Sequence, residues 1–467
     1  MGACALGREV HCRWQGHARL WCAGRCRHLL LKGTIMSRTI SRRTFAKASA
    51  AITLSLTAAG SSRVLGANDR VRLGFIGVAN RGGQLIAAFL RHSDAQIVAL
   101  CDVFQPTLES ANKRLEGKAQ TYRDFRKLLD CPEIDAVVIA TPDHWHAIQT
   151  IMACRAGKDV YVEKPLSMTV REGRRMVEVA RECNRVVQVG LHRRSSALYR
   201  QAAELIRSGK LGKVTVSRAY HVSNMYPSGI GKAKPSAPPP DLDWDLWLGP
   251  RPERPYQDNI TPYKFRWWML YSSQVANQGV HFVDIIRWLT GDEAPVSICA
   301  MGGRYAVEDD RTIPDTMESV FELNRSLAIL GIYEASGNPV LPRRGYVEVR
   351  GTLGTLYIGD RGFEVLPERG GQFQDRQPRM EPMEVASTEG DHTVQHARNF
   401  LDCVKSRARP NADVEIGHRS TTFSLLANIS LVTRSRIDWD PKRETITNNS
   451  QANELLHYEY RKPWKLG

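Results

Sequence analysis

The sequence predicts an α/β protein with two main parts: a doubly wound parallel sheet, and a second α/β domain built on a large, mixed, mostly antiparallel open sheet. Three observations support this fold class. In residues 70–190 apolar strand patterns alternate with helical patterns, which is typical of parallel βαβ units. In residues 191–391 strand patterns cluster with few helices between them. Helical spacing returns in residues 392–467, which we expect to pack back on both domains.

The first part opens with a strand over 71–77, which the turn Gly77-Val78-Ala79-Asn80-Arg81-Gly82 joins to a helical pattern. The turn matches GxGxxG except at Ala79, which stands at the second glycine. A second strand, Ala95 to Leu100, ends beside Asp102. This order predicts a Rossmann unit, because the turn brings N–H groups to a pyrophosphate and the acid can bind ribose hydroxyls. Asp102 favours NAD over NADP, since a carboxylate repels a 2′-phosphate.

Two later strands of this unit end in polar residues, at the edge where ligands of doubly wound sheets collect. Residues 134–140 lead into Thr141-Pro142-Asp143-His144-Trp145-His146, and residues 159–162 lead into Glu163-Lys164-Pro165. A lysine fixed beside proline at this edge is a candidate proton-transfer group, although a solvated loop lysine would give the same pattern. His144 and His146 could supply two ligands of a metal site. The sequence offers no third ligand, so we expect no metal.

The second part contains strand patterns at 214–222, 296–300, 317–323, 327–334 and 346–350, then a hairpin turn at 352–355 before 356–358. Helical patterns follow at 392–406 and 416–433. Between the first two strands, residues 223–270 are rich in proline and tryptophan. This segment is too aromatic for a disordered linker, and we expect an ordered loop that reaches across the active site or onto a neighbouring subunit.

The beginning of the chain carries most of its positive charge: residues 1–67 hold a net +10 of the total +16. The run Ser41-Arg42-Arg43-Thr44-Phe45-Ala46-Lys47 before an apolar stretch predicts a twin-arginine signal over 36–67, and hence export of a folded protein to the periplasm. We expect residues 1–35 to be upstream sequence and Met36 to be the start. The remaining +6 gives no reason to expect a nucleic-acid partner. The apolar stretch is shorter than the about 20 residues of a stable membrane span.

Four motifs, in their order along the chain, resemble those of the Gfo/Idh/MocA oxidoreductases. They are the turn 77–82, the run 140–146, Glu163-Lys164-Pro165, and Gly279-Val280-His281-Phe282-Val283-Asp284. The resemblance covers nearly all of residues 70–467. It implies a Rossmann domain that binds NAD, with NADP as the less favoured cofactor, and an α/β domain whose open sheet joins a homodimer or homotetramer. With the strand-end positions, it assigns cofactor contacts to Gly77, Ala79, Asn80, Arg81, Gly82, Asp102, Thr141, Pro142, His144, His146, Glu163 and Lys164.

The same resemblance places acid/base chemistry on Lys164 and His281; without it, His281 would be read as a core histidine. His281 and Asp284 share one face of a helix expected to start near Gln278. Inositol dehydrogenase-like members have an aspartate four residues before this histidine, where this chain has Asn277. Asparagine can orient a hydroxyl but cannot accept its proton, which leaves Lys164 and His281 as the acid/base pair. The predicted substrate contacts are His192, Arg193, Asn277, His281 and Asp284, whereas Arg194 is as consistent with a surface charge.

These features predict an exported NAD(P)-dependent oxidoreductase that acts on a small carbohydrate: a sugar, a cyclitol or a related polyol. Because free nicotinamide cofactor is scarce outside the cytoplasm, we expect NAD to stay bound and to be regenerated within the site. One alternative is an NAD-dependent glycosidase or lyase that oxidises its substrate transiently to a keto sugar. A second alternative is a non-catalytic sugar-binding protein, which Ala79 and Asn277 favour.

Overall fold

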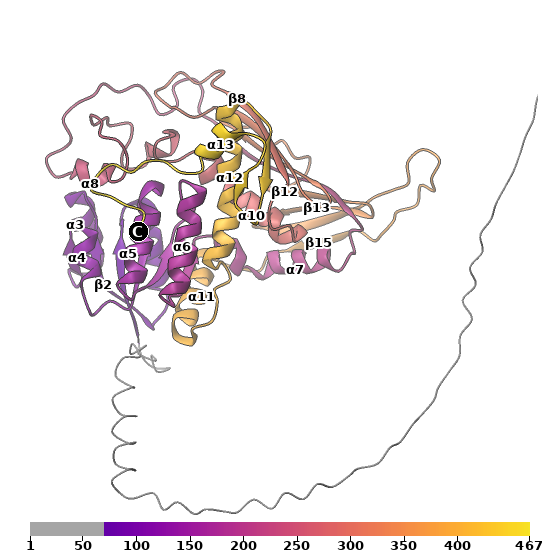
Figure 1. Cartoon of the computed structure of the whole chain (residues 1–467). Helices are drawn as coiled ribbons and strands as arrows, with labels where there is room; N and C mark the ends of the chain where they lie inside the picture. The colour runs from indigo at the N-terminus through magenta and orange to yellow at the C-terminus, as the bar shows by residue number, and fades with distance from the viewer. Residues whose placement is uncertain (1–69) are drawn as a thin grey trace, which may run out of the picture. The chain divides into compact units, whose positions relative to one another are not determined.

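A computed structural model describes residues 70–467 of the chain (Figure 1). The predicted upstream segment 1–35 and the twin-arginine signal 36–67 lie outside the described residues. Within residues 70–467, no helix combines the length and the apolar character that a membrane crossing requires.

The first domain is built on a parallel six-stranded sheet of order β3-β2-β1-β4-β5-β6. Its strands are β1 (Val71–Ile76), β2 (Ala95–Cys101), β3 (Gln120–Tyr122), β4 (Ala136–Ile139), β5 (Asp159–Val162) and β6 (Val187–Val189). The chain order reverses between β1 and β4, and ligands of such sheets bind outside the carboxyl ends of the strands at this reversal. The predicted doubly wound sheet is confirmed.

Helices connect these strands and cover the sheet. They are α2 (Asn80–Phe89), α3 (Gln105–Arg114), α4 (Phe125–Leu129), α5 (His146–Arg155) and α6 (Val170–Glu182), with a 3₁₀ turn η1 (Asp143–Trp145) before α5. A capping box starts α6: the Thr169 side chain accepts from the Glu172 N–H, and the Glu172 carboxylate accepts from the Thr169 N–H.

The second domain is built on an eleven-stranded mixed sheet, which confirms the second part of the predicted fold class. Its strands are β7 (Val214–Asn224), β8 (Ser297–Gly303), β9 (Thr316–Glu322), β10 (Leu327–Tyr333), β11 (Ala335–Ser336), β12 (Val347–Gly351), β13 (Gly354–Gly359), β14 (Gly362–Pro367), β15 (Met383–Ala386), β16 (Ile437–Asp440) and β17 (Thr445–Ile446). The central pair β7 and β10 is parallel, and the other neighbours in the sheet are antiparallel.

Several helices belong to the second domain or join it to the first. They are η2 (His192–Ser195), α7 (Ala197–Arg207), α8 (Trp244–Leu248), η3 (Lys264–Trp267), α9 (Gln274–Asn277), α10 (Gly279–Thr290), α11 (His392–Ser406), α12 (Val414–Thr433) and α13 (Ser450–Glu454). Helix α12 contacts both α6 of the first domain and β8 of the large sheet, and Figure 1 shows it running between them. Helix α11 contacts α2. The last helices of the chain therefore pack on both domains.

Phe400 anchors α11 to the first domain. Its side chain is fully buried and meets the rings of Phe89 and Tyr161 edge-on, with centroid separations of 6.1 and 5.9 Å. Edge-to-face contacts of this kind add to the free energy gained by burying the rings.

We expect Phe400→Ala to lower the free energy of unfolding by about 3–5 kcal/mol, because it leaves a cavity between α11 and the parallel sheet. Phe373, whose side chain is 90% exposed, offers a matched control, and Phe373→Ala should change the free energy by no more than about 0.5 kcal/mol. Urea unfolding followed by circular dichroism measures both. Equal midpoints for the two variants would contradict the anchoring role of Phe400.

Candidate active site

The glycine turn after β1 lies against the end of β4. Gly77 has φ +83°, and a Cβ there would come within 2.8 Å of the Ala140 carbonyl. A Cβ on Gly82 would lie 2.0 Å from the Gly77 oxygen. Both positions thus require glycine, whereas Ala79 has an ordinary φ of −73° at the N-cap of α2. No side chain caps this helix, so its first N–H groups are available to a phosphate.

Asp102 stands at the end of β2 and faces this turn. Its carboxylate accepts hydrogen bonds from the N–H groups of Val78 and Phe104, both at 3.0 Å. Burial raises the pKa of Asp102, and these N–H groups only partly oppose the effect. A carboxylate fixed beside the turn is the group that a Rossmann domain uses to hold ribose hydroxyls.

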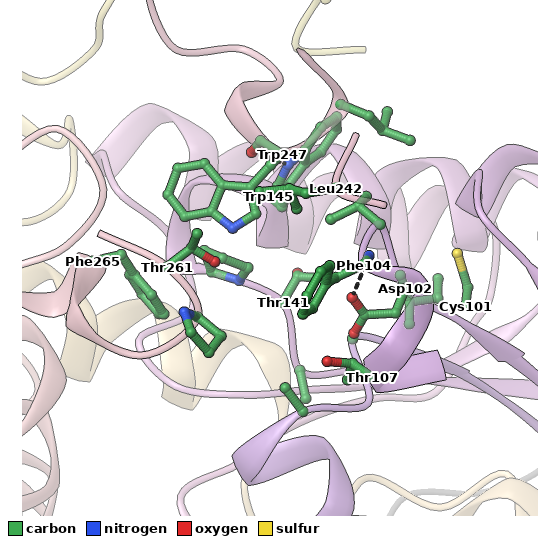
Figure 2. Close-up of a pocket in the computed structure, with 18 of the residues that line it drawn as sticks. Cys101, Asp102, Phe104, Thr107, Thr141, Trp145, Leu242, Trp247, Thr261 and Phe265 are labelled. Carbon is green, nitrogen blue, oxygen red and sulfur yellow. Dashed lines mark hydrogen bonds between the residues drawn. The ribbon is translucent and has the colours of Figure 1, made fainter. Parts of the chain in front are cut away.

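A pocket lies between the turn, Asp102 and the end of β4, and Figure 2 shows Asp102, Thr107 and Thr141 around it. The predicted cofactor residues that line it are Gly77, Ala79, Asn80, Arg81, Asp102, Thr141 and Pro142. The others, Gly82, His144, His146, Glu163 and Lys164, are not among the lining residues. The pocket combines free helix N–H groups with a ribose-binding carboxylate, so its residues fit a dinucleotide such as NAD.

The opposite wall of the pocket comes from residues 239–266, which we call the covering segment. Its lining residues are Pro239, Leu242, Leu246, Trp247, Tyr256, Thr261, Pro262, Phe265 and Arg266. Figure 2 shows Leu242, Trp247, Thr261 and Phe265 facing the Rossmann side. The proline and tryptophan content of this segment indicated an ordered loop over the site, but no local pattern singled out which residues would line the pocket.

The two histidines after β4 hold backbone segments in place. His144 is buried and donates from Nε2 to the Trp247 carbonyl at 2.9 Å, and burial lowers its pKa to about 3. His146 has Nδ1 at 2.7 Å from the Pro165 carbonyl and Nε2 at 3.0 Å from the Thr141 carbonyl. Among residues 70–467 no group of three or more His, Cys, Asp or Glu side chains could hold a metal ion.

An ion pair ties the glycine turn to the loop after β5. Arg81 Nε donates to Glu163 at 2.8 Å, and the Glu163 carboxylate also accepts from the Lys164 N–H at 3.2 Å. Burial alone would raise the pKa of Glu163, but Arg81 and Lys164 hold it below its ordinary value. A Cβ on Gly190 would come within 2.8 Å of the Glu163 carboxylate, so glycine there leaves room for the pair.

Lys164 reaches from the first domain into the second. Its Nζ donates to the backbone oxygen of Asn277 at 2.9 Å and to the side-chain oxygen at 2.5 Å. Burial lowers the pKa of Lys164 to about 8, against the opposing effect of Glu163. Asn277, at the end of α9, is 3% exposed, and its Nδ2 has no hydrogen-bond partner among residues 70–467. This N–H₂ group is free to donate to a substrate oxygen.

Two histidines extend this cluster of polar side chains: His281 is near enough to Lys164 for their charges to interact, and His192 lies beside His281. Their rings lie 5.2 Å apart between centroids, in an edge-on arrangement. Burial lowers the pKa of His281 well below its ordinary value, and the neighbouring charge of Lys164 lowers it further. Burial and the charge of Arg193 do the same for the pKa of His192. Both imidazoles are therefore neutral at pH 7, and each has one N–H donor and one acceptor nitrogen.

Arg193 and Asp284, the other two predicted substrate residues, form hydrogen bonds with other residues of the protein. Arg193 donates to both oxygens of Asp360, at 2.8 and 2.9 Å. Asp284 is 2% exposed and accepts from Arg194 at 2.9 Å and from Ser420 at 2.6 Å. Arg194 is thus part of a buried ion pair rather than a surface charge. These contacts suit positioning roles for Arg193 and Asp284, and their contact with substrate stays a prediction.

Comparison with known families identifies the chain. The model of the Gfo/Idh/MocA oxidoreductase family with an NAD-binding Rossmann fold matches residues 71–191. The model of that family's C-terminal alpha/beta domain matches residues 196–309 and 371–466. The chain belongs to the Gfo/Idh/MocA family. It is accordingly an NAD(P)-dependent oxidoreductase, and one wall of the pocket is formed by the carboxyl ends of β1, β2 and β4 of its NAD-binding Rossmann domain.

Individual relatives differ in their reactions. The chain is 30% identical to 1,5-anhydro-D-fructose reductase of Ensifer adhaerens over 33% of its own length and 46% of that protein. It is 24% identical to myo-inositol 2-dehydrogenase of Thermotoga maritima, over 63% and 81% of the two chains. It is 29% identical to alpha-N-acetylgalactosaminidase of Shewanella oneidensis, over 33% and 36%. The chain thus spans less than half the length of the first and third of these relatives.

The same two-domain fold occurs in solved structures. A levoglucosan dehydrogenase in complex with NADH and levoglucosan superposes with a TM-score of 0.61 at 18% identity, over 79% of this chain and 99% of the other. At this identity the similarity concerns the fold.

Proposed function

We propose that this protein oxidises an alcohol group of a sugar, cyclitol or related polyol by hydride transfer to tightly bound NAD. The observation that carries the proposal is the contact of Lys164 Nζ with Asn277, with His281 in the same polar group, at the carboxyl edge of the NAD-binding sheet. The reductase and inositol dehydrogenase among its relatives support a substrate of this class.

Lys164 is the proposed base for the hydroxyl proton. With a pKa of about 8, a useful fraction of its amine is neutral near pH 7–8 and can accept a proton. Asn277 fixes Nζ through two oxygens, and its free Nδ2 donates to a substrate oxygen. His281, neutral and beside Lys164, donates to or accepts from the same hydroxyl. Bound NAD supplies the hydride acceptor. With NAD held at the glycine turn and Asp102, Lys164 would take the hydroxyl proton while the cofactor would accept the hydride, so that the alcohol becomes a carbonyl.

We also propose that the protein works in the periplasm after export by the twin-arginine route. The support is the motif Ser41-Arg42-Arg43-Thr44-Phe45-Ala46-Lys47 and the apolar run after it. In that compartment the cofactor has to be reoxidised without leaving the protein. A second carbonyl substrate that accepts the hydride in the same site would achieve this.

Glycoside cleavage is the second candidate, and the similarity to an alpha-N-acetylgalactosaminidase favours it. In such a reaction a sugar hydroxyl would first be oxidised to a ketone. A base would then remove the proton from the adjacent carbon, and the glycosidic alcohol would leave, protonated, from the carbon beyond it. Water would add to the double bond that forms, and the ketone would be reduced again. Lys164 and His281 would move the protons of both schemes. The two candidates therefore differ in net redox change and not in the residues required.

Both candidates are tested on protein purified with its own nucleotide. We expect denatured protein to release near-stoichiometric NAD, identified by mass spectrometry, and native protein to reduce that NAD when a sugar or cyclitol substrate is added. Lys164→Ala should slow this reduction by about 100-fold or more, because it removes the base. The exposed Lys118 provides the control, and Lys118→Ala should react normally.

Release of nitrophenol from a nitrophenyl glycoside without net NADH would favour the second candidate. Normal turnover by Lys164→Ala would exclude the proposed role of Lys164.

The pH dependence of oxidation should report on Glu163. Oxidation needs neutral Lys164, so its rate should rise as the pH passes about 8. The Glu163 carboxylate stabilises the Lys164 ammonium, so Glu163→Gln should lower the pKa of Lys164 and move the half-maximal rate to lower pH. The amide oxygen of glutamine still accepts from Arg81. Glu178→Gln on the exposed face of α6 is the control and should leave the profile in place. A shift to higher pH, or none, would argue against this coupling.

We propose a homodimer or homotetramer joined through the open sheet. On the face of the sheet away from its helices, neighbouring strands expose Met301 (72%), Val320 (38%) and Leu327 (43%). Exposed apolar side chains on the open face of a sheet support a contact surface there. We expect Met301→Glu to shift sedimentation velocity toward the monomer. A parent protein that sediments as a monomer at micromolar concentration would contradict the proposal.

A further inference from the structure

The covering segment is fastened to the Rossmann domain by main-chain contacts beside the proposed ribose site. Leu242 and Phe104 form an antiparallel bridge. Two hydrogen bonds flank it: the Gln105 N–H donates to Asp241 at 3.1 Å, and the Asp243 N–H donates to Val103 at 3.0 Å. Phe104 follows Asp102 by two residues, so this part of the segment lies over the end of the pocket that holds Asp102.

The middle of the covering segment is hydrogen-bonded to residues that follow β4. The Trp247 carbonyl accepts from Trp145 Nε1 at 3.1 Å and from His144 Nε2 at 2.9 Å. Gly249, which ends α8, has φ +54°, and a Cβ there would lie 2.2 Å from the Trp145 ring. The segment thus packs directly on Trp145, which itself lines the pocket.

The last residues of the chain contact the same part of the covering segment. We call residues 457–467 the tail; it leaves α13 in the second domain and ends beside α5 in the first (Figure 1). The Arg461 N–H donates to the Pro250 carbonyl at 2.9 Å. Its guanidinium donates to the carbonyls of Gly249 (3.0 Å) and Asp245 (2.9 Å) and to the Asp245 carboxylate (2.5 Å). One arginine therefore binds the carboxyl end of α8, where a cation is favoured.

The tail also backs the aromatic wall of the pocket. The Trp464 ring meets Trp145 edge-on at 4.7 Å and stacks near Phe125 at 6.2 Å, and the Arg126 guanidinium lies 5.2 Å from its centre. Trp145 and Phe125 both line the pocket. Nearer α13, the Tyr460 hydroxyl donates to the buried Glu172 carboxylate at 2.5 Å.

We propose that the tail is a latch: Trp464 anchors it on the Rossmann domain, Arg461 holds the covering segment closed over the NAD pocket, and the two together set the rate at which the cofactor is exchanged. The inference rests on the proposed function only in taking NAD as a cofactor that stays bound. Arg461 binds the main chain of the covering segment, so these contacts must break for the segment to open, whether nucleotide enters or leaves. The latch therefore slows both uptake and release of nucleotide, and Arg461 acts as a positioning residue away from the reacting atoms.

The test measures nucleotide exchange and not turnover. Full-length protein is loaded with NADH, and the loss of bound-NADH fluorescence is followed after excess NAD is added. We expect Arg461→Ala to release NADH about tenfold faster or more, and the nucleotide-free protein to take up NADH faster as well, because both steps pass through the open segment. Lys465→Ala, at an exposed cation in the same tail, is the matched control and should exchange at the parent rate.

Unchanged exchange in Arg461→Ala, with an unchanged thermal midpoint, would overturn the latch. Faster release without faster uptake would also overturn it, since that result describes a lost wall contact. If Arg461→Ala does not fold, Arg461→Lys replaces it: lysine keeps the charge but not the fork that spans the carbonyls, and its exchange should still exceed that of the parent. A parent that exchanges NADH slowly yet oxidises no polyol would refute the proposed function and leave the latch standing.

Discussion

The ion pair between Arg81 and Glu163 is the constraint on which the site depends. Arg81 belongs to the first turn of α2, where the cofactor phosphates are expected, and Glu163 belongs to the loop that presents Lys164. One contact therefore sets the position of the nucleotide-binding turn relative to the proposed base. Glu163 is almost fully buried, so loss of Arg81 would leave its carboxylate in the interior with Lys164 as the remaining neighbouring cation. Nucleotide binding and proton transfer would therefore share one supporting contact.

The remaining residues of the site come from the second domain. The packing between the two domains therefore determines how the site residues are aligned. Asn277 and His281 lie on α9 and α10, and a buried network of Arg194, Asp284 and Ser420 fastens α10 to η2 and α12. Helix α12 in turn contacts α6 of the first domain. The alignment of Lys164 with Asn277 is thus maintained by helix packing at a distance from the site.

Local pattern and motif order were enough to predict the Rossmann sheet, the glycine turn and Asp102, because each depends on residues close together in the sequence. The covering segment was predicted as an ordered loop, but its individual pocket residues were not, since contacts such as Leu242 with Phe104 have no sequence period. The sequence left the role of Arg194 open for the same reason, because its partner Asp284 is distant in the chain. Strands β15, β16 and β17 were missed because they have only four, four and two residues, too few to show an apolar alternation.

The parallel pairing of β7 with β10 at the centre of the large sheet has a consequence for the order of folding. The chain between Asn224 and Leu327 contains the covering segment, α9 and α10, so it supplies the cover of the pocket together with Asn277 and His281. Pairing across so long a connection costs more chain entropy than forming the local βαβ units, and we expect it to come later. The nucleotide-binding turn would then form while its pocket is still open. Nucleotide captured at that stage would become enclosed as the rest of the protein folds around it.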